Sequence, residues 1–249
     1  MFEKEPTGIE NFDALIDGGI PKNHIVLVSG APGTGKSIFA QHFIYTGASK
    51  YGQKGLYISF EQRVPEIYKQ ASEIGLDFEK LERQGLVRFI YLDLSWRKFS
   101  KDKTMFHILG EEIANFKPQR IVIDSLSPLS EIPASVDELV EYGYLSELDK
   151  LISLPQSSEL YIRLRITKLF GMLKDSGATC ILTSDIPKQD VWLSRDHVSE
   201  FLCDGLIFLK YTNMGGSQRF LSIEKMRGVK HCEEIIPFEI TSKGFRILK

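Results

Sequence analysis

The sequence predicts an α/β fold with a mostly parallel central sheet, helices on its faces and antiparallel strands added at the C-terminal end. Up to residue 183, apolar and β-branched segments alternate with helical patterns, which is typical of the strand–helix–strand units of parallel sheets. After residue 205, strand-like segments follow one another with only short turns between them, which favours antiparallel pairing. Because no repeat or low-complexity linker divides the chain, we expect residues 1–249 to form a single domain.

Composition and charge are those of an ordinary globular protein. The 249 residues are 43% apolar and 26% charged, which is ample for a sizeable core. A net charge of −2 gives no overall attraction to nucleic acid or to an anionic membrane. No apolar segment reaches the ~18 residues of a membrane span, and the N-terminus lacks a signal-peptide pattern, so we expect a cytoplasmic location. Cys180, Cys203 and Cys232 show no metal-binding spacing, and we expect the first two to be buried thiols.

Residues 1–24 are expected to form a lead-in element that packs beside the core. Phe12, Leu15 and Ile16 have the spacing of a helical turn. The glycine pair at 18–19, followed by Pro21, ends that turn.

The segment 30–37, with the sequence GAPGTGKS, matches the G-x-x-x-x-G-K-[S/T] pattern of a phosphate-binding loop. A strand-like segment at 25–29 precedes it, and apolar residues with helical spacing follow it, whereas a glycine-rich surface turn would need neither. Gly33 and Gly35 can adopt positive φ, so the backbone can curl around an anion at the positive end of the helix dipole. Lys36 would reach the β- and γ-phosphates, and the hydroxyl of Ser37 would bind Mg²⁺. We therefore expect ATP or ADP to contact Gly30, Ala31, Pro32, Gly33, Thr34, Gly35, Lys36, Ser37 and Ile38.

Strands and helices alternate through the middle of the chain. The pattern predicts strands at 55–60, 86–91, 120–124 and 178–183, and helices at 65–74, 104–116 and 159–176. Between the fourth strand and the last helix, residues 127–158 are locally acidic and hold three prolines, so we expect an insert with two short helices. Three final strands are predicted at 206–209, 220–224 and 245–248, with a hairpin turn at 213–216.

Two carboxylates end strands of the predicted sheet. Asp124 ends the fourth strand, where Mg²⁺ bound at the phosphate loop needs an acidic partner, although a strand-end aspartate can also simply cap the next turn. Glu61 follows the second strand. Since ligands of open parallel sheets sit at the carboxyl ends of strands, Glu61 can activate a water at the γ-phosphate; it can equally be a solvated loop residue.

Two cations continue an apolar strand pattern near the C-terminus. In an extended chain, Leu221, Ile223, Lys225 and Arg227 share one face. Cations are not buried without a partner, so either the strand has left the core at Lys225 or the two cations meet an anion.

Taken together in their order, these motifs resemble the KaiC-like branch of the RecA-fold ATPases over nearly the whole chain. The matching segments are Thr-Gly-Ile at 7–9, Gly-Gly-Ile-Pro at 18–21, the loop at 30–37, Ser-Phe-Glu at 59–61, Ile-Val-Ile-Asp-Ser at 121–125, Cys-Asp-Gly at 203–205, Lys-Met-Arg-Gly at 225–228 with His231, and Pro-Phe-Glu-Ile-Thr at 237–241.

The resemblance implies a homo-oligomeric ring, usually a hexamer, that holds Mg·ATP between neighbouring subunits and hydrolyses it. It implies that Glu61 is the catalytic base. It also implies that Lys225 and Arg227 act in trans on the neighbour's γ-phosphate, which would give the two cations their anion. His231, Thr241 and Ser242 match residues near the nucleotide in relatives.

The chain departs from the family pattern at several places. Gln62 stands where relatives often have a second glutamate, and because glutamine cannot act as a base, we expect slow turnover. Ser242 stands where relatives are often acidic, and the acidic insert at 127–158 has no firm counterpart.

Two other functions stay open at this point. A recombinase-like ATPase would bind single-stranded DNA, and Lys188, Trp192 and Arg195 after the fifth strand suit a phosphate backbone and a stacked base. The acidic segment after the fourth strand would repel phosphate, so nucleic acid is possible as a partner but not favoured. The third function is a nucleotide-switched signalling scaffold or autokinase.

Overall fold

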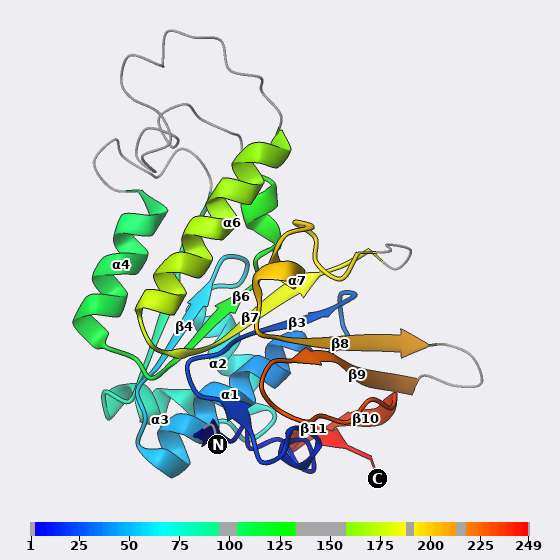
Figure 1. Ribbon diagram of the computed structural model, residues 1–249. Coiled ribbons are helices and arrows are strands. Elements are labelled where there is room, and N and C mark those ends of the chain that lie inside the picture. The colour runs from blue at the N-terminus through cyan, green and yellow to red at the C-terminus, as the bar shows by residue number, and fades with distance from the viewer. Residues whose placement is uncertain (1–2, 95–103, 133–157, 188–191, 213–217, 249) are drawn as a thin grey trace, which may run out of the picture.

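The computed structural model describes residues 3–94, 104–132, 158–187, 192–212 and 218–248. Within these residues, nine strands form one sheet in the order β11-β10-β9-β8-β3-β7-β6-β4-β5 (Figure 1). The sheet strands are β3 (Ile25–Gly30), β4 (Gly55–Ser59), β5 (Val87–Tyr91), β6 (Arg120–Asp124), β7 (Thr179–Asp185), β8 (Gly205–Thr212), β9 (Gln218–Met226), β10 (Ile236–Thr241) and β11 (Gly244–Ile247). The helices are α1 (Lys36–Tyr51), α2 (Val64–Ser72), α3 (Phe78–Arg83), α4 (Met105–Phe116), α6 (Ser158–Asp175) and α7 (Ser199–Leu202), with the short 3-10 helices η1 (Asp13–Ile16) and η2 (Ser127–Ser130).

The sheet is parallel on one side and antiparallel on the other, so the predicted α/β fold is confirmed. The six strands from β5 to β8 pair in parallel. The last three strands pair antiparallel and extend the sheet beyond β8. This division follows from the connections: helices link the parallel strands, whereas short segments suffice for antiparallel neighbours.

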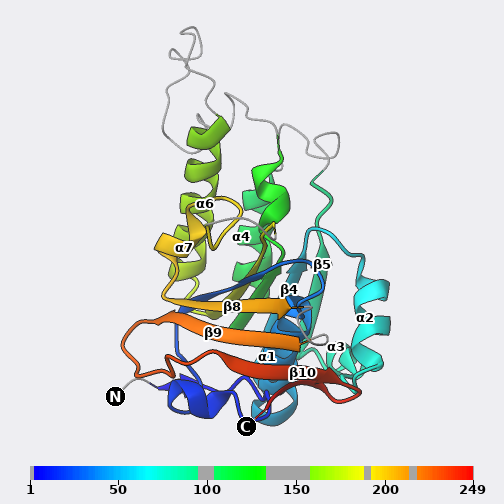
Figure 2. The same ribbon diagram turned by 90° about the vertical axis from the view of Figure 1, so that its right-hand side faces the viewer.

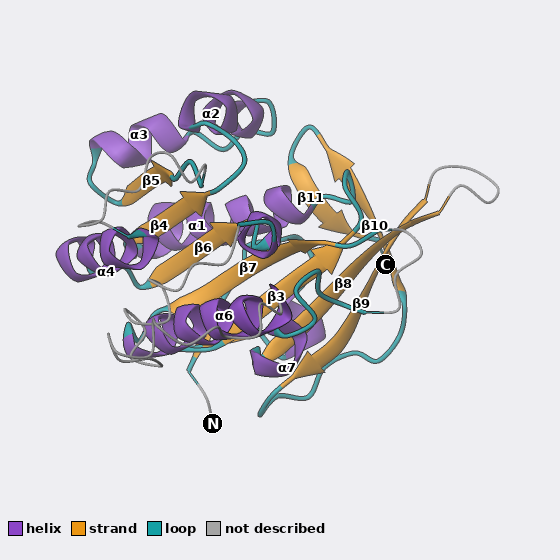
Figure 3. Ribbon diagram, turned by 90° about the horizontal axis from the view of Figure 1, so that it is seen from above, coloured by secondary structure: helices purple, strands orange, loops and turns teal. Residues whose placement is uncertain are grey.

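Helices cover both faces of the sheet and bury two separate apolar cores. Helices α1, α2 and α3 lie on one face, and α4, α6 and α7 lie on the other (Figure 3). On β3, Val26 and Val28 point into the first core, while Ile25 and Leu27 point into the second. A parallel strand buried on both faces needs apolar residues at every position, which is why this segment reads as an unbroken apolar run.

Most predicted elements are confirmed within a few residues, and the missed ones are short. Helix α4 begins after Thr104, whose hydroxyl accepts the His107 N–H at 3.3 Å. The six-residue α3 was not predicted; its N-cap is Asp77, whose carboxylate accepts the Lys80 N–H at 3.0 Å. Strand β10 was also missed, as were α7 and the pair β1 (Lys4–Glu5) and β2 (Ile20–Pro21).

The lead-in is fixed to the sheet by a buried ion pair. Arg120 of β6 is 1% exposed, and its Nε lies 3.0 Å from the carboxylate of Glu5, which is 3% exposed. The guanidinium also donates to the carbonyls of Pro6 and Phe43, both at 2.8 Å. Burial raises the pKa of Glu5 and lowers that of Arg120, so each charge depends on the other to stay ionised. Figure 2 shows the lead-in on the opposite side of β9 from α6 and α7.

His42 of α1 joins this helix to the C-terminal hairpin and makes stability depend on pH. Its Nε2 accepts the Phe245 N–H at 3.1 Å, so the imidazole is neutral. Burial lowers its pKa from 6.5 to about 4, and the charge of Lys50 adds a smaller effect in the same direction. Since the unfolded imidazole takes up a proton first, the stabilisation is complete above about pH 6.5 and is lost as the pH falls towards about 4.

We expect this loss to amount to about 3 kcal/mol of unfolding free energy. Urea unfolding across that pH range should show it in the wild type and not in His42→Gln, whose amide oxygen can still accept the Phe245 N–H. Parallel pH curves for the two proteins would contradict this role of His42.

Several predictions fall on residues outside the described ranges. Of the predicted insert with two short helices at 127–158, residues 133–157 lie outside the described residues, and η2 is found at its start. The predicted hairpin turn at 213–216 and Lys188 also lie outside the described residues. Among the helices that are described, none combines the length and apolar character needed to cross a bilayer.

Candidate nucleotide site at the carboxyl edge of the sheet

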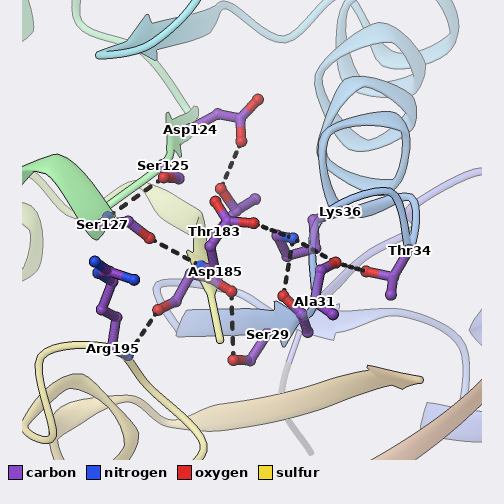
Figure 4. A network of polar contacts seen from close by, with 12 residues as sticks. Ser29, Ala31, Thr34, Lys36, Asp124, Ser125, Ser127, Thr183, Asp185 and Arg195 are labelled. Carbon is purple, nitrogen blue, oxygen red and sulfur yellow. Dashed lines mark hydrogen bonds and ion pairs between the residues drawn. The ribbon is translucent and has the colours of Figure 1, made fainter. Parts of the chain in front are cut away.

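Four parallel strands end at one edge of the sheet and bring the predicted site residues together. The phosphate loop follows β3, Asp124 ends β6 and Asp185 ends β7 (Figure 4). Glu61 follows β4, which lies next to β6 in the sheet. The crevice outside the carboxyl ends of parallel strands is where open α/β sheets bind ligands.

The phosphate loop has the backbone that the sequence predicted. Gly33 and Gly35 have φ of +80° and +107°, which side-chain-bearing residues rarely adopt. A Cβ on Gly35 would also lie 2.8 Å from Cδ1 of Ile240, so a larger residue would have to move this side chain as well as adopt the strained φ. A Cβ on Gly33 would meet nothing within 4 Å, so the loop faces open space there. No side chain caps α1, which leaves the first-turn N–H groups available to an anion.

Lys36 lies folded into the loop against an aspartate that sequence reasoning missed. Its Nζ donates to the carbonyls of Gly30 at 2.9 Å and Ala31 at 3.1 Å. It also pairs with Oδ1 of Asp185 at 2.6 Å. The predicted strand stopped at residue 183 because the apolar run ends there, whereas β7 continues for two polar residues and carries Asp185 to the edge.

The Asp124 carboxylate is held by two hydroxyl groups. The Tyr57 hydroxyl donates to Oδ2 at 2.5 Å and the Thr183 hydroxyl to Oδ1 at 2.5 Å. Burial and the Asp124 charge raise the pKa of Tyr57, so this hydroxyl stays a donor. Within the part of the chain that the structure describes, both carboxylate oxygens accept from strand hydroxyls and no hydrogen bond joins them to the following turn, which argues against a role as a turn cap.

Ser37 and Asp124 fit the oxygen ligands that Mg²⁺ prefers, one hydroxyl and one carboxylate. Among the described residues, no three His, Cys, Asp or Glu side chains form a group that could hold a metal ion. Mg²⁺ binds readily with one or two protein ligands when phosphate oxygens and water complete its shell, so this donor set suits a nucleotide-bound ion.

Glu61 is exposed, but one hydrogen bond fixes its orientation. The Ser125 hydroxyl donates to Glu61 Oε1 at 2.6 Å. Desolvation raises the pKa of Glu61; the Ser125 hydrogen bond opposes this rise, and the charges of Asp185 and Asp124 add to it. A carboxylate with a raised pKa at the strand edge has the properties of a general base.

Lys225 and Arg227 lie at the opposite edge of the sheet from the phosphate loop of their own chain. Lys225 pairs with Leu206 at the start of β8, and Lys225 Nζ donates to the carbonyl of Glu200 at 3.3 Å. Arg227 Nη1 lies 3.3 Å from Asp204 Oδ1, and its side chain is 56% exposed. The loop begins at the carboxyl end of β3, whereas strand pairing puts Lys225 level with the first residues of β3, so both cations are separated from the phosphate loop of their own chain.

The prediction that Lys225 and Arg227 share one face of the strand with Leu221 and Ile223 was wrong. A β-bulge shifts the register of β9 between Ile223 and Lys225, with Glu224 as the extra residue. After the bulge, Met226 takes the core-facing position with 4% exposure. Lys225 pairs with Leu206 on the other face of the sheet, and Arg227 points outward.

Of the other residues predicted near the nucleotide, Thr241 and Ser242 lie close to the phosphate loop, whereas His231 does not. Thr241 ends β10 beside Ile240, which packs against Gly35, and Ser242 is exposed in the following turn, so both lie close to the loop. His231 lies elsewhere: it lines a cavity of about 870 Å³ on the β8–β9 surface, together with Phe208 and Phe220.

Comparison with known proteins agrees with this geometry. The sequence matches the family described as "ATPase: KaiC" over residues 5–140 and 146–249. The chain belongs to the KaiC family of ATPases. Membership confirms the resemblance inferred from the motifs, and it supports a nucleotide-binding P-loop protein with ATPase activity.

The relatives are of two lengths. A UPF0273 protein from Methanocaldococcus jannaschii is 30% identical over 96% of this chain and 93% of its own length. The "Circadian clock oscillator protein KaiC" of Parathermosynechococcus lividus is 28% identical, and this chain spans 42% of it. The solved structure of a KaiC-like protein from Pyrococcus horikoshii OT3 covers the whole chain with a TM-score of 0.79 and 28% identity.

Proposed function

We propose that this protein is a Mg²⁺-dependent ATPase that works as a homo-oligomeric ring, a hexamer, with ATP held between neighbouring subunits. The observation that supports this proposal most is that the phosphate loop and the two cations are separated within one chain. The loop, Glu61 and Asp124 lie at one edge of the sheet, and Lys225 and Arg227 lie at the other. A head-to-tail interface that repeats around a closed ring would bring these two edges together.

Different residues of the chain would bind the phosphates and accept the proton during hydrolysis. Main-chain N–H groups of the loop and Lys36 bind the phosphates. Glu61, oriented by Ser125, accepts a proton from the water that attacks the γ-phosphorus, and ADP departs with the bonding electrons. Mg²⁺, when held by Ser37 and Asp124, neutralises charge on the phosphate oxygens.

Arg227 would have to exchange partners to act on a neighbour. In the single chain it pairs with Asp204, which also accepts the Ile25 N–H at 2.9 Å and forms an ion pair with Lys174. Burial raises the pKa of Asp204, but the Ile25 N–H and Lys174 lower it more, so that it lies below its usual range. With its side chain mostly exposed, Arg227 can turn to a neighbour's phosphate while Lys174 keeps Asp204 paired.

Single-stranded nucleic acid remains a second candidate partner because of one exposed aromatic group. Trp192 is 45% exposed and stacks on His197 with ring centroids 5.0 Å apart. However, Arg195 beside it pairs with Glu131 at 3.0 Å, so the described part of this loop offers little free positive charge. The signalling scaffold or autokinase stays a prediction.

Solution mass with and without Mg·ATP tests the proposed function. We expect ATP to shift the wild type towards the mass of six chains and phosphate to be released. Lys36→Ala should release no phosphate, because the loop loses the cation that reaches the β- and γ-phosphates. A protein that stays a monomer with bound ATP, or that releases phosphate as a monomer, would contradict the shared site.

A further inference from the structure

The ion pair between Lys36 and Asp185 occupies the place where a nucleotide's phosphates would go. Strand pairing puts Asp185 directly beside Gly30, the first residue of the phosphate loop. Its Oδ1 lies 2.6 Å from Lys36 Nζ, and the two side chains are 24% and 6% exposed (Figure 4). An ion pair this sheltered from water is screened little by salt, so it competes strongly with any other anion for Lys36.

A chain of hydrogen bonds holds Asp185 in place and links it to Glu61. The Asp185 N–H donates to Ser127 Oγ at 2.9 Å, and the Ser127 N–H donates to Ser125 Oγ at 3.3 Å. Ser125 Oγ in turn donates to Glu61 Oε1 at 2.6 Å. The Asp185 backbone is therefore fixed, so its carboxylate can leave Lys36 only by turning about its side-chain bonds, and it stays beside the loop when phosphate arrives.

We propose that Asp185 is a resident counter-ion of Lys36, which a nucleotide must displace and which weakens ATP binding more than ADP binding. This inference rests on the proposed function, because it assumes that the loop binds a nucleotide. Lys36 contacts the β- and γ-phosphates in loops of this kind. The displaced carboxylate then faces the γ-phosphate, and two like charges at close range repel each other.

Magnesium should reduce this penalty. An ion held by Ser37 and Asp124 beside the γ-phosphate neutralises part of the charge that Asp185 opposes. Asp185 would thus make the loop select Mg·ATP over the metal-free nucleotide, which is a specificity function and not a direct part in the chemical step.

The test is calorimetric titration of the full chain with ADP and with a nonhydrolysable ATP analogue, each in Mg²⁺ and in EDTA. We expect Asp185→Asn to bind the ATP analogue in EDTA about 10–100-fold more tightly than the wild type. The gain should be smaller for ADP and smaller again with Mg²⁺. Asp185→Glu keeps the charge and should stay near the wild type, also providing a folded comparison if Asp185→Asn is unstable.

Asp17→Asn is the matched control, since Asp17 is exposed and pairs with Lys4 away from the site. Unchanged or weaker analogue binding by Asp185→Asn in EDTA, or an equal gain for both nucleotides, would overturn the inference while leaving the ATPase proposal intact. A wild type that binds neither nucleotide would overturn both proposals.

Discussion

Replacing Glu61 by glutamine is expected to lower ATP turnover about 10²–10⁴-fold and to leave ATP binding nearly unchanged. Glutamine keeps the size of the side chain and can still accept the Ser125 hydrogen bond, but it cannot take a proton from the attacking water. The loop, Lys36 and Asp124 are untouched, so the nucleotide still binds. Phosphate release and nucleotide titration on the same preparation measure the two effects.

Glu66→Gln on helix α2 is the matched control. Glu66 is exposed, and the substitution makes the same chemical change away from the carboxyl ends of the strands. Its turnover should equal that of the wild type. Ser125→Ala should lower turnover less than Glu61→Gln does, since the base remains but loses its fixed orientation. If Glu61→Gln turns over ATP at the wild-type rate, Glu61 is not the base.

Arg227→Ala is expected to lower turnover by about 10³–10⁵-fold, the range seen for arginine fingers in phosphoryl transfer. Lys36→Ala should be equally inactive, but for a different reason. The Lys36→Ala chain lacks the cation of its own phosphate loop, whereas the Arg227→Ala chain lacks the cation that it supplies to the nucleotide of a neighbouring subunit. Arg246→Ala, which removes an exposed arginine paired with Glu239 on the C-terminal hairpin, is the matched control and should stay active.

Mixing the two inactive variants tests where Arg227 acts. In a ring with random order, a site that combines the intact loop of an Arg227→Ala copy with the arginine of a neighbouring Lys36→Ala copy is complete. At equal amounts, about a quarter of the sites should then recover activity. If Arg227 acted within its own chain, each mixture would stay inactive, because no copy holds both residues.

The sequence was informative wherever a residue's role depends on local pattern. The apolar run before Gly30, the glycines of the loop and the strand ending in Asp124 all lie where their spacing predicted. Parallel strands buried on both faces leave long apolar segments, and their carboxyl ends meet at one edge. Those two facts were enough to place Glu61 and Asp124 near the loop.

The missed features depend on contacts distant in sequence. Asp185 reaches the site because hydrogen bonds to β3 extend β7 past its apolar run. The bulge at Glu224 follows from pairing with β8, and a period of two along β9 cannot reveal it. Strand β10 contains Pro237, and a proline within a segment lowers the expectation of a strand from pattern alone.

The most direct test of the account is a structure of the Mg²⁺ complex with a nonhydrolysable ATP analogue. We predict the phosphates on the loop of one copy, and Lys225 or Arg227 of the adjoining copy within hydrogen-bonding distance of the γ-phosphate, with Arg227 released from Asp204. A bound analogue with Lys225 still at the Glu200 carbonyl and Arg227 still at Asp204 in every copy would contradict the shared site.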